Sequence, residues 1–100
     1  MSLSTHVLDA VTGRPAQDVP VRLERAGAVV TTARTDADGR VRDLGALTAG
    51  VHRLVFDTAA AFPDGFYPEV VVTFTVTDPS AHHHVPLLLS PFAYSTYRGS

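Results

Sequence analysis

Polar and apolar residues alternate along most of this 100-residue chain, with a period of two. From residue 19 to residue 24, for example, valine, valine and leucine alternate with proline, arginine and glutamate. Successive side chains of a strand point to opposite faces, so this alternation predicts strands that bury one face. We expect such strands at residues 4–9, 19–25, 28–35, 41–44, 51–57, 70–76, 82–90 and 92–97.

Turn-forming residues separate these stretches. Asp36-Ala37-Asp38-Gly39 predicts a tight turn, because glycine tolerates a positive φ and aspartate accepts hydrogen bonds from nearby backbone. Thr58 to Phe62 contains three successive alanines and predicts one short helix. About eight short strands with closely spaced turns predict an all-β sandwich, and the length of the chain predicts a single domain over residues 1–100.

The strand expected at Val70 to Val76 is apolar on nearly both faces. A sandwich of this size buries only about 60–70% of the surface of its unfolded chain, so it has limited room to cover two apolar faces. We therefore expect the chain to associate with copies of itself, and we do not expect a deep cleft inside one subunit.

Composition excludes several classes of protein. Apolar residues make up 45% of the chain and charged residues 18%, with a net charge of -2, which is typical of a globular protein. All eight basic residues are arginine and are scattered, so we expect no nucleic-acid partner. No apolar run approaches the roughly 20 residues that span a bilayer, so we expect no membrane partner. The absence of cysteine and of a signal-peptide pattern leads us to expect a cytoplasmic location.

Histidine is the main candidate for chemistry. On a strand, His82 and His84 share one face and His83 points away. An imidazole titrates near neutral pH and suits general acid–base catalysis. A metal site is an alternative, although two ligands on one face fall short of the three or four of a committed zinc site. By local pattern alone His6 is structural, and His52 is an edge or surface residue.

Arginine and the last eight residues are the other candidates. Arg40 directly follows the predicted turn, and its planar guanidinium suits an anionic or carbonyl-rich ligand. The segment from Ala93 to Ser100 reads AYSTYRGS, with two tyrosines and an arginine directly after an apolar strand. Such a segment is expected to dock on the domain, where it would meet the histidine cluster at residues 82–84.

Four segments together resemble the transthyretin-related proteins. They are LSTHVLDAVTGRP (Leu3 to Pro15), TDADGR (Thr35 to Arg40), FYPEV (Phe66 to Val70) and HVPLLLSPFAYSTYRGS (His84 to Ser100), in the same order. Within that family, the final YRGS resembles the 5-hydroxyisourate hydrolase branch and is missing from the hormone carriers. This sequence departs from the family pattern at His83, where an aromatic residue is usual, and in the short stretch between Glu24 and Thr35.

The resemblance implies a fold, an assembly and an activity. The fold would be a transthyretin or prealbumin-like β-sandwich of about eight strands with one short helix. Copies would form a homotetramer with clefts at the dimer–dimer interface. The activity would be hydrolysis of 5-hydroxyisourate, without metal or other cofactor, to 2-oxo-4-hydroxy-4-carboxy-5-ureidoimidazoline in urate catabolism. Carried over by motif, His6, Arg40 and His84 would be catalytic, and the substrate-binding residues would be Tyr97, Arg98, Gly99 and Ser100.

A non-catalytic function remains an alternative. A transthyretin-like module could hold a small aromatic ligand without chemistry, as could a domain appended to another enzyme. The presence of His6, Arg40, His84 and the YRGS segment favours the hydrolase.

Overall fold

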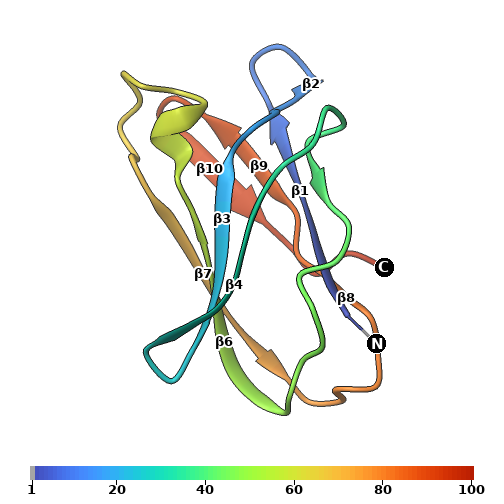
Figure 1. The fold of residues 1–100 in the computed structure, drawn as a ribbon. Helices are drawn as coiled ribbons and strands as arrows, with labels where there is room; N and C mark the ends of the chain where they lie inside the picture. The colour runs from blue at the N-terminus through green and yellow to red at the C-terminus, as the bar shows by residue number, and fades with distance from the viewer. Residues whose placement is uncertain (1) are drawn as a thin grey trace.

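A computed structural model describes residues 2–100 and confirms the predicted β-sandwich. Two sheets face each other, and the first and last described residues lie at the same end of the molecule (Figure 1). The strands are β1 (Leu3–Asp9), β2 (Arg14–Pro15), β3 (Pro20–Arg25), β4 (Ala28–Arg34), β5 (Arg40–Val41), β6 (Gly50–Phe56), β7 (Val70–Val76), β8 (His83–His84), β9 (Leu87–Ser90) and β10 (Ala93–Thr96). One helical turn, η1 (Thr58–Ala60), follows β6.

The first sheet is built around β1. This strand pairs antiparallel with β2 and β5, and parallel with β8 and β9. Strand β10 pairs antiparallel with β9 and forms the edge of the sheet. Because β1 is contacted by four other strands, segments that are up to 80 residues apart in the chain meet along it.

The second sheet has the order β4-β3-β6-β7 and consists of antiparallel pairs. Ala26 and Gly27 join β3 to β4, and a bulge between Leu23 and Glu24 shifts the register of this hairpin. Strands β4 and β7 form the two edges of this sheet.

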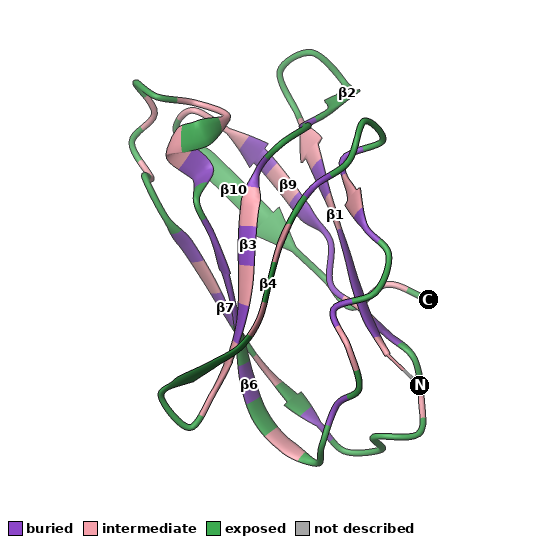
Figure 2. Ribbon diagram, viewed as in Figure 1, coloured by how far each residue is buried: buried purple, intermediate pink, exposed green. Residues whose placement is uncertain are grey.

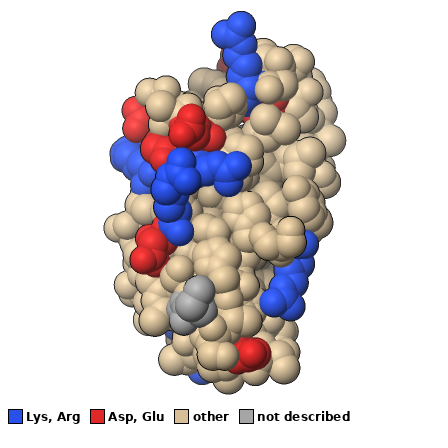
Figure 3. All heavy atoms as spheres, turned by 90° about the vertical axis from the view of Figure 1, so that its right-hand side faces the viewer, with Lys and Arg blue, Asp and Glu red and all other residues tan. Residues whose placement is uncertain are grey.

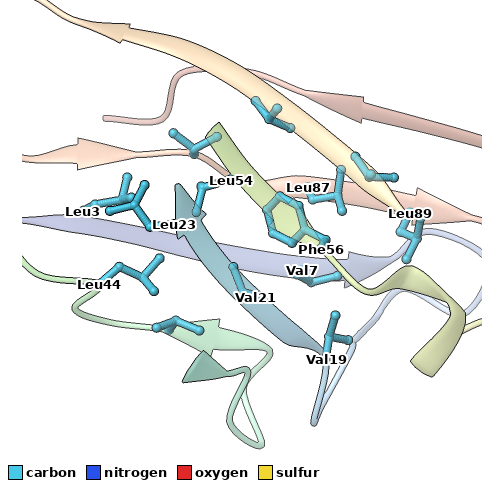
Figure 4. Close-up of a cluster of buried hydrophobic side chains, with 14 of the residues drawn as sticks. Leu3, Val7, Val19, Val21, Leu23, Leu44, Leu54, Phe56, Leu87 and Leu89 are labelled. Carbon is cyan, nitrogen blue, oxygen red and sulfur yellow. The ribbon is translucent and has the colours of Figure 1, made fainter. Parts of the chain in front are cut away.

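The core lies between the sheets, as the alternation predicts. Along β1, Leu3, Thr5 and Val7 face inward and are almost completely buried. Leucine, valine and phenylalanine side chains from both sheets point toward one another in the core (Figure 4), and buried and less buried positions alternate along several strands (Figure 2). Each fully buried side chain of this size stabilises the fold by about 1.5–3 kcal/mol relative to an exposed one.

Four local predictions need correction. Only residue 41 of the strand expected at residues 41–44 lies in a strand, which is β5. The stretch at residues 82–90 forms two strands, since Pro86 has no N–H to donate between them. The expected helix is a single 3₁₀ turn that ends before Pro63. The prediction that His52 lies at an edge or surface is wrong: only 3% of it is exposed, because β6 places it on the core face, where it stacks on Phe74 with ring centroids 5.8 Å apart.

The turn before β5 is fixed in position by hydrogen bonds to Asp36 and by its closeness to β1. The Asp36 carboxylate accepts hydrogen bonds from the backbone N–H groups of Asp38 (2.8 Å) and Arg40 (3.0 Å). Gly39 has a φ of +73°, and a Cβ at this position would lie 2.6 Å from the carbonyl oxygen of Val7. The turn therefore presses against β1, and glycine is needed both for its conformation and for its closeness to that strand.

We predict that Gly39→Ala lowers the thermal stability of the protein much more than Gly27→Ala. Both glycines have a positive φ, but a Cβ at Gly27 meets nothing within 4 Å. The control substitution should cost about 1 kcal/mol for the backbone conformation alone, and the clash at Gly39 should add to that cost. Thermal unfolding of the two variants measures the difference, and equal melting temperatures would contradict the close approach of turn and strand.

Candidate active site

The outer face of β1 carries polar side chains. Ser4 and His6 alternate with the inward-facing residues of this strand and point away from the core. Neither is fully exposed: Ser4 is 9% exposed and His6 is half-buried. Neighbouring strands add further polar groups to this face, including Arg40 from β5 and His84 from β8.

Arg40 lies directly beside His6. The two residues are opposite each other in the antiparallel register of β1 and β5, so their side chains share one face of the sheet. Within residues 2–100, Arg40 forms no ion pair, whereas the nearby Arg42 pairs with Asp36 and Asp38. A guanidinium without a carboxylate partner remains available for an anionic or carbonyl ligand.

Strand β8 brings the histidine cluster to the same face. Ser4 is paired with His84 in the parallel register of β1 and β8. The Ser4 hydroxyl lies 2.8 Å from Nδ1 of His84 and 2.9 Å from Nε2 of His82, so these two histidines do share a face. His83 points the opposite way and is 4% exposed.

The C-terminal segment lies against His84. The backbone N–H of Gly99 donates to the carbonyl oxygen of His84 at 2.8 Å. A Cβ at Gly99 would lie 2.5 Å from Cδ2 of the His84 ring, so only glycine lets the backbone pass this close to the imidazole. The segment is therefore docked on the histidine cluster, at the end of β10.

These residues surround an open cleft of about 410 Å³. It is lined by Ser4, Arg40, His82, His84, Tyr97, Gly99 and Ser100. His6 is not part of this lining, but it lies next to Arg40 in the sheet. Arg98 does not line this cleft, but it lines a second cavity of about 220 Å³, together with His83 and the β7 residues Val72 and Phe74. Tyr97 lines both cavities.

Burial and nearby positive charge favour the neutral forms of the two site histidines. Burial lowers the pKa of His84 below the 6.5 of a free imidazole, and the positive charges of Arg40, His6 and His82 lower this pKa further. Burial also lowers the pKa of His6, and Arg40 adds to the effect. A neutral imidazole has a free lone pair, so both side chains can accept a proton near neutral pH.

The cleft also contains Ser4, which the sequence did not single out, and His82, which it singled out together with His84. The sequence could have identified Ser4, because it lies two residues before His6 and so shares the face of β1 that His6 occupies. The position of His82 beside Ser4 depends on the pairing of β8 with β1, which no local pattern reveals.

Figure 3 views the side of the molecule that is on the right in Figure 1. Charged side chains gather in one part of this side, and most of its surface is uncharged.

No metal site is formed by the described part of the chain. Residues 2–100 contain no group of three or more histidine, cysteine, aspartate or glutamate side chains placed to hold a metal ion. The arrangement instead provides two proton acceptors, a cation and hydroxyl groups, which is a set suited to hydrolysis by activated water. The same residues contain no helix that is long and apolar enough to cross a membrane.

The chain is similar to known proteins in both sequence and structure. The model of the HIUase/Transthyretin family matches residues 3–99. The chain is 43% identical to 5-hydroxyisourate hydrolase of Salmonella dublin, over a match that covers 98% of this chain and 80% of that protein. The structure of Klebsiella pneumoniae 5-hydroxyisourate hydrolase is similar over the full length of both chains, with a TM-score of 0.92 and 38% identity.

Transthyretin itself is also similar. The structure of sea bream transthyretin in complex with thyroxine has a TM-score of 0.88 and 33% identity, over 99% of this chain and 95% of that one. The chain therefore belongs to the HIUase/Transthyretin family. Its similarity to curated hydrolases over nearly all its length identifies it as a hydrolase of that family.

We predict that Arg40→Gln raises the pKa of both His6 and His84, because it removes a positive charge that disfavours each imidazolium. Titration of the histidine side chains by NMR measures both pKa values. Arg53→Gln is the matched control, since Arg53 is exposed on β6 of the other sheet. The proximity of Arg40 to the two histidines would be contradicted if their pKa values were the same in both variants.

Proposed function

We propose that this chain hydrolyses 5-hydroxyisourate to 2-oxo-4-hydroxy-4-carboxy-5-ureidoimidazoline, as a step of urate catabolism. One observation carries the proposal: Arg40, which has no ion-pair partner among residues 2–100, shares one sheet face with two histidines of lowered pKa, beside a cleft bordered by the C-terminal segment. 5-Hydroxyisourate is an oxidised purine with electrophilic ring carbonyls. Its ring is opened when water adds to a carbonyl carbon and the bond from that carbon to a ring nitrogen breaks.

The histidines carry the proton transfers. One neutral imidazole takes a proton from water as the oxygen attacks the carbonyl carbon, and a proton is delivered to the ring nitrogen as the carbon–nitrogen bond breaks. His84 lines the cleft, while His6 lies beside Arg40 just outside its lining. This placement favours His84 as the base and gives His6 the role of orienting Arg40 or the water.

Arg40 binds and stabilises the oxygens of the substrate. Its planar guanidinium can donate two parallel hydrogen bonds to a carbonyl and to the oxyanion that forms when water attacks. The hydrogen bonds of the Asp36 turn hold the backbone of Arg40 in place before substrate arrives. Such preorganisation reduces the cost of arranging charge during the reaction.

The C-terminal segment forms one wall of the site. Tyr97 and the end of the chain at Gly99 and Ser100 contribute to the lining, and we assign substrate contacts to these three residues. Arg98 lines the second cavity and not this cleft, so we assign to Arg98 no side-chain contact with the substrate. The absence of cysteine suits a reducing compartment, and the cytoplasmic location remains a prediction.

We also propose that the working form is a homotetramer. The strands β7 and β10 lie at sheet edges, and large apolar side chains are exposed near them: Phe66 is 69%, Phe92 75% and Tyr97 60% exposed. Uncovered edges and apolar surface of this kind favour association. A second copy over the open cleft would complete its enclosure.

A non-catalytic role as a small-ligand carrier is the alternative. The similarity to a transthyretin that binds thyroxine is nearly as strong in fold as the similarity to the hydrolase. A carrier needs shape and apolar surface, but it does not need two neutral histidines beside a cation. The two functions differ in an ultraviolet assay: only a hydrolase makes freshly generated 5-hydroxyisourate decay faster than it does spontaneously.

In that assay, we predict that His84→Asn and His6→Asn each lower turnover, by about 10²–10⁴-fold for the residue that transfers the proton. Arg40→Lys should also be strongly impaired, since a point charge cannot reproduce a planar fork. Arg53→Lys, on the exposed face of β6, is the matched control and should keep full activity. Near-normal turnover in both histidine variants would rule out this catalytic pair.

For the assembly, we predict a particle of four times the 10.7 kDa mass of one chain at micromolar concentration. Light scattering coupled to size exclusion measures this mass directly. A stable monomer with full hydrolytic activity would contradict both the tetramer and the completion of the cleft by a second copy.

A further inference from the structure

An unbroken line of polar side chains leads from His84 to the surface. The Ser4 hydroxyl is within hydrogen-bond distance of both His84 Nδ1, at 2.8 Å, and His82 Nε2, at 2.9 Å. The other ring nitrogen of His82 lies 3.4 Å from the hydroxyl oxygen of Ser2. His82 is exposed, whereas Ser4 is 9% exposed, so the line runs from the cleft toward solvent.

A single hydroxyl can occupy the middle of this line in two ways. It has one hydrogen, so it donates to one imidazole and accepts from the other. If Ser4 donates to His82, then Nδ1 of His84 carries a hydrogen and its Nε2 presents a lone pair, as a base requires. If Ser4 instead donates to His84, then Nε2 of His84 carries the hydrogen, as an acid requires.

Electrostatics favours moving a proton from His84 to His82. A proton that stays on His84 creates a cation close to Arg40 of β5 and His6 of β1, in a partly buried position. These are the groups, together with His82, whose charges disfavour the imidazolium of His84. Moving the positive charge to the exposed ring of His82 places it farther out, where water can solvate it.

We propose that Ser4 and His82 form a proton relay for His84, an inference that rests on the hydrolytic function proposed above. Water gives a proton to Nε2 of His84 as its oxygen attacks; Nδ1 of His84 gives its own proton to Ser4, and Ser4 gives its hydrogen to Nε2 of His82. His84 is then neutral, with Nε2 protonated and ready to act as the acid.

The second half of the reaction runs the relay in reverse. His84 donates its Nε2 proton to the ring nitrogen as the carbon–nitrogen bond breaks, Ser4 returns a proton to Nδ1, and His82 returns one to Ser4. Each group ends as it began, and no external proton donor is needed. One histidine can thus act first as base and then as acid without holding a positive charge beside Arg40.

The hydrogen-bond chain can be tested without substrate. In ¹⁵N NMR spectra of the histidine side chains, Ser4→Ala should change the proportion of the two neutral tautomers of His84, because the group that selects between them is gone. Thr48→Ala, a hydroxyl deletion at an exposed loop position, is the control and should leave the proportion unchanged. An unaltered tautomer ratio in Ser4→Ala would overturn the relay, whatever the activity of the parent protein.

Kinetics then test the transfer itself. Ser4→Ala and His82→Ala should each lower kcat roughly tenfold to hundredfold with little change in KM, since neither residue is assigned a substrate contact. Ser4→Thr keeps the hydroxyl and should restore most of the rate. Added imidazole should rescue His82→Ala but not Ser4→Ala.

Different results would refute the relay and the hydrolytic function. Parental kcat in His82→Ala across the pH range would refute the relay while leaving the hydrolase intact. A parent protein that does not accelerate the decay of 5-hydroxyisourate would refute the function, and the tautomer measurement would still decide whether Ser4 controls His84.

Discussion

The site depends on the pairing of β1 with three other segments. This strand holds β5 on one side and β8 with β9 on the other, so the registers His6 with Arg40 and Ser4 with His84 bring a cation and an imidazole to one face. A shift of one residue in either register would turn these side chains to the core face. The inward-facing leucine and valine of β1 prevent such a shift, because they are completely buried. The packing of the core therefore also fixes the geometry of the cleft.

Charge and burial act together at this face. Arg40 has no carboxylate partner within residues 2–100, and the two histidines near it are driven toward their neutral forms. A carboxylate placed beside Arg40 would neutralise it and would favour the imidazolium forms. The arrangement is thus poised for a ligand that brings its own negative charge or carbonyl oxygens, and for proton transfer near neutral pH.

The sequence predicted the architecture well because the strands are short and strongly alternating. It also placed His82 and His84 on one face, which follows from the period of two. It failed for His52, because a polar side chain on an apolar face says nothing about whether an aromatic neighbour such as Phe74 will cover it. It could not place Ser4 between two histidines either, since that contact joins residues about 80 positions apart through strand pairing. The position of Arg98 at the second cavity, outside the lining of the cleft, likewise depends on where β10 docks.

We propose that the cleft between Arg40, His84 and Gly99 binds a purine. The most direct test is an NMR titration of the labelled protein with urate, a stable purine closely related to 5-hydroxyisourate. If urate binds there, chemical shifts should change at Ser4, Arg40, His84 and Gly99 and reach saturation together. Changes confined to the second cavity, at Val72, Phe74 and Arg98, would contradict it.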